Sequence, residues 1–89
     1  MTNNPSICIP KINNNITKTD IMSVFKKLNI GNIINIRFVG KESKTVFIKM
    51  GYWNKNKHSQ ELCNRLIRGE AVNIVYDFPW YWKCVMMRG

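Results

Sequence analysis

Aromatic side chains with cationic neighbours are the residues of this chain whose types and spacing could do chemistry. Phe47 and Lys49 lie in one stretch of alternating apolar and polar residues, and Arg37 lies in an earlier stretch of the same kind. Near the carboxy terminus, residues 80–83 read Trp-Tyr-Trp-Lys. Aromatic rings stack on nucleobases and cations neutralise phosphates, so these side chains are the ones that single-stranded nucleic acid requires.

The specific hypothesis divides these residues by role. Phe47 and one of Trp80 and Trp82 are expected to stack on bases. Phosphate contacts are assigned to Arg37, Lys49 and Lys83. Two structural alternatives stay open: the carboxy-terminal aromatics could cover Phe47 and enlarge a small core, or they could dock on a second copy of the chain and form a homodimer.

Catalytic and metal-binding chemistry finds little support. His58 is the single histidine, and Cys63 is expected to face the core, so a cysteine–histidine nucleophile is not predicted. Cys8, Cys63 and Cys84 are widely spaced, unlike the close pairs of structural zinc sites, and no two carboxylates are paired for acid–base work. We therefore expect no enzyme activity, metal, cofactor or small-molecule substrate.

Composition favours a polyanionic partner. The chain has 89 residues and a formal net charge of +9, which gives one small domain with a strongly positive field. No apolar run is long enough for a membrane span, and the polar amino terminus has no secretory pattern. An intracellular or virion protein that is not secreted, with reduced cysteines, is the expectation.

Two helical and four strand patterns organise the chain. Alternating apolar residues predict strands near residues 6–10, 34–38, 46–50 and 72–76. Apolar residues at helical spacing predict a helix after a capping box formed by Thr17 and Asp20, and a second helix that ends at Gly69. The order is β-α-β-β-α-β.

This order predicts an α+β, ferredoxin-like fold over residues 6–77. Right-handed crossovers place both helices on one face of an antiparallel sheet with strand order 4-1-3-2 and leave the other face open. Residues 78–89 are expected to form an aromatic and basic extension that packs on the domain or on a partner.

The chain resembles an RNA recognition motif up to about Tyr76. Residues 7–12 look like the family's strand-one motif, residues 43–50 like its strand-three motif, and residues 17–31 like its first helix. The resemblance implies base stacking at three positions, which here hold Cys8, Thr45 and Phe47. Only Phe47 is aromatic, so the departure favours weak sequence specificity.

Residues 75–83 also look like the closing motif of small RNA-recognition-motif-like proteins encoded by large DNA viruses. Taken together, these observations predict binding of nucleic acid, with single-stranded RNA preferred, through charge and limited stacking. The alternative is a structural or interaction module, either a homodimer or a virion protein, that uses the sheet and the aromatic extension for protein contacts.

Overall fold

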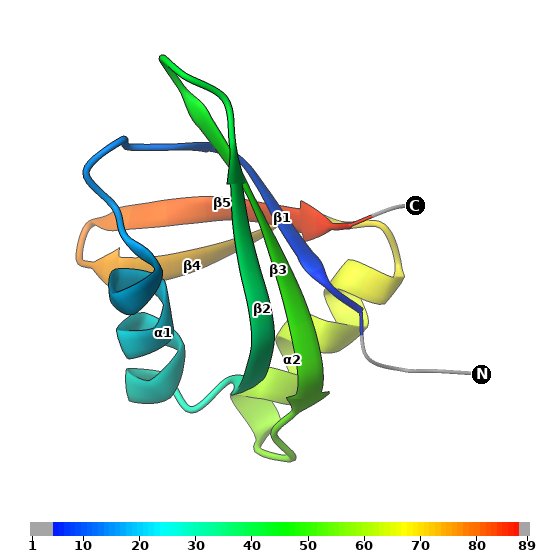
Figure 1. The fold of residues 1–89 in the computed structure, drawn as a ribbon. Helices are drawn as coiled ribbons and strands as arrows, with labels where there is room; N and C mark the ends of the chain where they lie inside the picture. The colour runs from blue at the N-terminus through cyan, green and yellow to red at the C-terminus, as the bar shows by residue number, and fades with distance from the viewer. Residues whose placement is uncertain (1–4, 88–89) are drawn as a thin grey trace.

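The fold was analysed in a computed structural model of the chain, which describes residues 5–87. Two short segments lie outside the described residues. They are residues 1–4, within the amino terminus that was expected to lack a secretory pattern, and residues 88–89, the last two of the predicted extension. The described residues form two helices and five strands, arranged as in Figure 1. In chain order these are β1 (Ile7–Ile12), α1 (Lys18–Lys27), β2 (Gly31–Val39), β3 (Lys44–Trp53), α2 (Lys57–Ile67), β4 (Val72–Asp77) and β5 (Trp80–Met86).

Side-chain caps fix where both helices begin. The Thr17 hydroxyl accepts a hydrogen bond from the Asp20 amide at 3.2 Å, and the Asp20 carboxylate accepts one from the Thr17 amide at 2.9 Å. This is the predicted capping box. At α2 the Asn56 side chain accepts a hydrogen bond from the Ser59 amide at 2.8 Å. These bonds satisfy amide groups that have no partner within the first helical turn.

The predicted strand order 4-1-3-2 is wrong. The sheet has the order β2-β3-β1-β5-β4, and every neighbouring pair is antiparallel. β5 lies beside β1, where residues 72–77 were expected, and it separates β1 from β4, which keeps its expected place at the edge. The physical reason is the short turn at residues 78 and 79, which folds β5 back along β4 as a hairpin.

The aromatic extension is therefore largely part of the domain. The boundary drawn after Asp77 falls inside the β4–β5 hairpin, and residues 80–86 form a strand in the sheet. Trp82 and Cys84 point into the core from this strand and are 4% and 0% exposed. The α+β class and the two helices agree with the prediction, whereas the sheet has one strand more.

The sheet separates a packed face from an open face. Alternate residues of the strands form one core with α1, which buries Ile21 and Phe25, and with α2, which buries Leu62 and Leu66. Both helices thus cover the same face. In Figure 1, β2 and β3 run across the direction of the β4–β5 hairpin, so the sheet is strongly twisted. Neither described helix is long and apolar enough to cross a membrane.

Candidate nucleic-acid interface

The ring of Phe47 lies near the middle of the open face. Phe47 is half-buried, because β3 directs Val46 and Ile48 into the core and Phe47 to the opposite side. Arg37 of β2 is its direct cross-strand partner. The guanidinium carbon of Arg37 lies over the ring, 5.2 Å from its centre, in a cation–π contact.

A row of side chains crosses the open face at the level of Phe47. Arg37 pairs with Phe47, Phe47 pairs with Cys8 of β1, and Cys8 pairs with Val85 of β5. Directly paired residues of antiparallel strands point to the same side of the sheet. Because Cys8 is much smaller than an aromatic residue, the flank of the Phe47 ring opposite Arg37 borders a low part of this surface.

Two further predicted cations lie on the same face. Lys49 is exposed on β3, two residues from Phe47, and pairs with Asn35 of β2. Lys83 is exposed on β5 and pairs with Asn73 of β4. Lys83 is two residues from Val85, so strand alternation gives it the same orientation as the row. The open face thus gathers Arg37, Lys49 and Lys83, which are all the predicted phosphate contacts.

Thr45 is the third position that the family resemblance selects on this face, and its hydroxyl is already engaged. It donates a hydrogen bond to the carbonyl oxygen of Pro10 at 2.9 Å. Pro10 has no amide hydrogen, and the register between β1 and β3 shifts between Ile9 and Ile12. Thr45 therefore stabilises an irregular stretch of β1, and it has no aromatic ring that could stack on a base.

Trp82 does not fit the predicted stacking role. Its side chain is 4% exposed and lies in the core, where its ring stacks on Tyr76 with 4.6 Å between ring centres and 15° between planes. A base could reach it only if the core opened. The sequence-based alternative, that at least one tryptophan of the segment enlarges the core, describes its position.

Trp80 is exposed but lies at a distance from Phe47. It begins β5, five residues before Val85 in the row that contains Phe47, where the β4–β5 register is irregular. Its side chain is 64% exposed, because it lies at the end of the hairpin beyond the core. The structure therefore separates Trp80 from the predicted site.

Tyr81 is the aromatic residue that the site prediction missed. It is 53% exposed, pairs with Val75, and shares the orientation of Lys83 on the open face. The alternation of residues 82–84 contained this signal, because an inward tryptophan at position 82 requires its neighbour Tyr81 to point outward. The second ring on the open face is consequently Tyr81.

The cysteines are placed for packing. None of the three forms a disulfide. Burial raises the pKa of all three thiols, and for Cys84 burial, with a smaller contribution from nearby Cys8, raises the pKa to about 12. Reactive cysteines have lowered pKa values, so these thiols are poor nucleophiles at neutral pH. Within residues 5–87 no group of three or more histidine, cysteine or carboxylate side chains could hold a metal ion.

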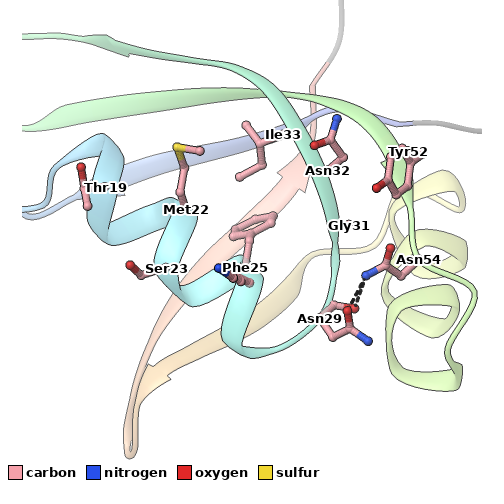
Figure 2. A pocket seen from close by; sticks show the side chains of 11 residues that line it. Thr19, Met22, Ser23, Phe25, Asn29, Gly31, Asn32, Ile33, Tyr52 and Asn54 are labelled. Atoms are coloured by element: carbon pink, nitrogen blue, oxygen red, sulfur yellow. Dashed lines mark hydrogen bonds between the residues drawn. The ribbon is translucent and has the colours of Figure 1, made fainter.

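A hollow of about 430 Å³ lies between α1 and the start of β2 (Figure 2). Met22, Phe25 and Ile33 supply its apolar lining, and Asn29 and Asn54 are joined at its rim by a hydrogen bond of 2.7 Å. Its lining contains no histidine, cysteine or carboxylate. The hollow is thus separate in position and in chemistry from the cationic open face.

Comparison of the chain with models of known protein families, with curated protein sequences and with solved structures found no match.

Proposed function

We propose that this domain binds single-stranded nucleic acid, with RNA as the preferred ligand, across the open face of its sheet. The observation that carries the proposal is the environment of Phe47. Its half-buried ring lies under the guanidinium of Arg37 and two residues from exposed Lys49, on a face that no helix covers. An open sheet face that carries a ring and cations suits an unpaired strand better than a small molecule.

The site offers few groups that could read base edges. Arg37, Lys49 and Lys83 are suited to phosphates, while Phe47 and Tyr81 are suited to stacking, which tolerates any base. The two other positions where RNA recognition motifs stack bases hold Cys8 and Thr45. The proposal is therefore binding with weak sequence preference, in a domain that resembles this family.

Titration of a labelled single-stranded RNA at several salt concentrations tests the proposal, with single-stranded DNA and duplex DNA as controls. We expect the single strands to retain a preference over the duplex as salt rises, because stacking requires unpaired bases while the phosphate contribution is screened. Equal loss of binding to every polyanion would contradict it. That result would favour the alternative, a module that uses this face for protein contacts.

A matched pair of lysine variants locates the phosphate contacts. Lys49→Gln removes a cation from the open face, and Lys57→Gln removes an exposed cation from the start of α2. Loss of one phosphate contact on a single strand lowers the slope of log affinity against log salt by about 0.7. We expect this change for Lys49→Gln and a smaller one for Lys57→Gln. Equal changes would mean that the strand does not lie on the open face.

A further inference from the structure

The end of the β4–β5 hairpin carries exposed aromatic side chains that the proposed site does not use. We call Phe78, Pro79 and Trp80 the hairpin tip. Phe78 is 87% exposed and Trp80 is 64% exposed, and Pro79 between them is also exposed. Phe78 has the largest exposed fraction of any large apolar side chain among residues 5–87. The same hairpin buries Trp82 in the core, whereas the rings of Phe78 and Trp80 lie outside the core.

A cation lies beside the hairpin tip. Lys27, in the last turn of α1, lines a hollow of about 240 Å³ together with Phe78 and Leu28. The one carboxylate in that lining is Asp77. The whole chain carries +9, so a second copy would bring a large like charge to the tip, whereas an anionic surface is attracted to it.

The shape and the residue types of the tip point to a lipid surface. It is the turn of a hairpin, and both of its rings expose most of their surface. Tryptophan is enriched where apolar and aqueous phases meet, because its ring is apolar and its N–H is a donor. Phenylalanine adds apolar area that a bilayer can bury without a preformed complementary partner. Anionic headgroups meanwhile attract lysines next to the inserted residues.

We propose that the hairpin tip docks on an anionic bilayer surface, with Phe78 and Trp80 inserted at the headgroup level and Lys27 facing the lipid headgroups. Two weak signals act together here. Neither a small apolar insertion nor a few cations holds a protein on a membrane by itself, but their combination does. The proposal is independent of the nucleic-acid site, because the tip shares none of Phe47, Arg37, Lys49 and Lys83.

The chain contains its own probe for the test. Of its three tryptophans, Trp53 and Trp82 are buried at 6% and 4% exposure, so only Trp80 can change its solvent environment when the folded protein binds. The full chain is mixed with vesicles of pure phosphatidylcholine or of phosphatidylcholine with phosphatidylserine, and binding is measured by co-sedimentation. We expect binding to the anionic vesicles, a blue shift of the emission, and quenching by brominated lipids.

Paired double variants separate insertion from charge. Phe78→Ser with Trp80→Ser removes the rings of the tip and leaves every charge in place. Tyr52→Ser with Ile34→Ser removes two side chains of similar exposure, 57% and 61%, from β3 and β2. We expect the tip variant to bind the anionic vesicles roughly tenfold more weakly or worse, as the lost transfer of two apolar side chains requires, and the control variant to bind unchanged. Circular dichroism checks that both variants fold.

Several results would overturn the proposal. Equal vesicle binding by the tip variant and the control would show that charge alone acts. A blue-shifted emission that depends on protein concentration without lipid would place a second copy on the tip. Loss of RNA binding in the tip variant would assign the tip to the nucleic-acid site. Failure of Lys49→Gln to change the salt dependence of RNA binding, in contrast, would contradict the open-face site and would leave the proposal for the tip unaffected.

Discussion

At the scale of single residues, Phe47 decides whether the open face stacks on bases. Its ring contacts Arg37 at one side and borders Cys8 at the other, so truncation removes both a surface for a base and the support for a guanidinium. Phe47→Ala should weaken binding of single-stranded RNA by about 1 to 3 kcal/mol, the value of one base–aromatic stack. Fluorescence anisotropy with a labelled RNA measures the loss.

The control for this variant is Ile67→Ala, which removes an exposed apolar side chain from α2 on the covered side of the sheet. Both variants should keep the circular dichroism spectrum of the parent chain. If the two variants bind RNA with the affinity of the parent chain, the sheet has no part in the mechanism. If both are weakened equally, the effect is general and Phe47 is not a stacking residue.

Cys84 makes stability sensitive to alkaline pH. Burial raises its pKa to about 12 in the folded chain from 9.0 for an ordinary thiol, so the folded state holds its proton more tightly than the unfolded state. The contribution of this proton to the free energy of unfolding is complete below about pH 9 and is lost as pH rises towards about pH 12. In urea titrations, the Cys84→Ala variant should therefore lose less stability than the parent chain between about pH 8 and about pH 11. If both proteins lose stability equally as pH rises, Cys84 is not the cause of the pH dependence.

At the scale of elements, the Asn56 cap joins α2 to the segment after α1. Its side-chain oxygen accepts from the Ser59 amide, and its side-chain nitrogen donates to the carbonyl oxygen of Asn29 at 2.7 Å. Asn29 has a φ of 55°, a left-handed conformation that asparagine adopts more readily than most residues. Ser59, fully buried, also donates to the carbonyl oxygen of Ile30. The start of α2 is thereby fixed to the turn that leads into β2.

Asn56→Ala should lower the free energy of unfolding by about 1 to 2 kcal/mol, because it removes the cap and the bond to Asn29 together. Asn56→Asp should lose less, since a carboxylate still caps the helix and favours its amino-terminal end, but it cannot donate to Asn29. Urea denaturation monitored at the tryptophans measures both. A smaller loss for alanine than for aspartate would show that the cap carries little of the stability.

The elements differ in how well the sequence predicts them. Both helices followed from local signals, because caps and helical apolar spacing depend on neighbouring residues. The aromatic segment contained the same kind of alternation, but it was assigned to an extension because four strands already completed a known arrangement. Whether a strand pairs at the edge or in the middle depends on long-range contacts, such as Cys8 with Val85, which no local pattern contains.

The candidate site was predictable only in part, because local patterns give the side of a strand on which a residue lies but not which strands are neighbours. Strand parity alone placed Phe47, Arg37 and Lys49 on one face, and the structure brings them together. Lys83 joins them only because β5 lies in the sheet. Trp82 was placed among the accessible rings because composition does not distinguish an aromatic residue that stabilises a small core from one that binds a ligand.

At the scale of the whole molecule, β5 is required for the domain to fold. A chain that ends at Asp77 loses Trp82 and Cys84 from the core and leaves one edge of β4 and one edge of β1 without a partner strand. Loss of one buried aromatic side chain already costs about 3 to 5 kcal/mol, against a total stability of about 5 to 15 kcal/mol for a domain. We expect this truncated chain to be unfolded or insoluble by circular dichroism and light scattering.

A chain that ends at Met87 is the control, because it keeps all of β5. It should fold as the full chain does. A folded, monomeric protein that ends at Asp77 would show that residues 80–86 are dispensable. In that event the β4–β5 pairing would not be needed to complete the core.

The pairing of Ile7 with Met86 also dictates when the protein can fold during its synthesis. β1 is synthesised before the other strands of this domain, yet Met86 of its partner strand β5 follows Ile7 by 79 residues. Until then the apolar side chains of β1 and β4 have no complete layer to pack into, and such non-local pairing is slow to form. The nascent chain should accordingly stay open to chaperones until residue 86 has emerged, and then close cooperatively.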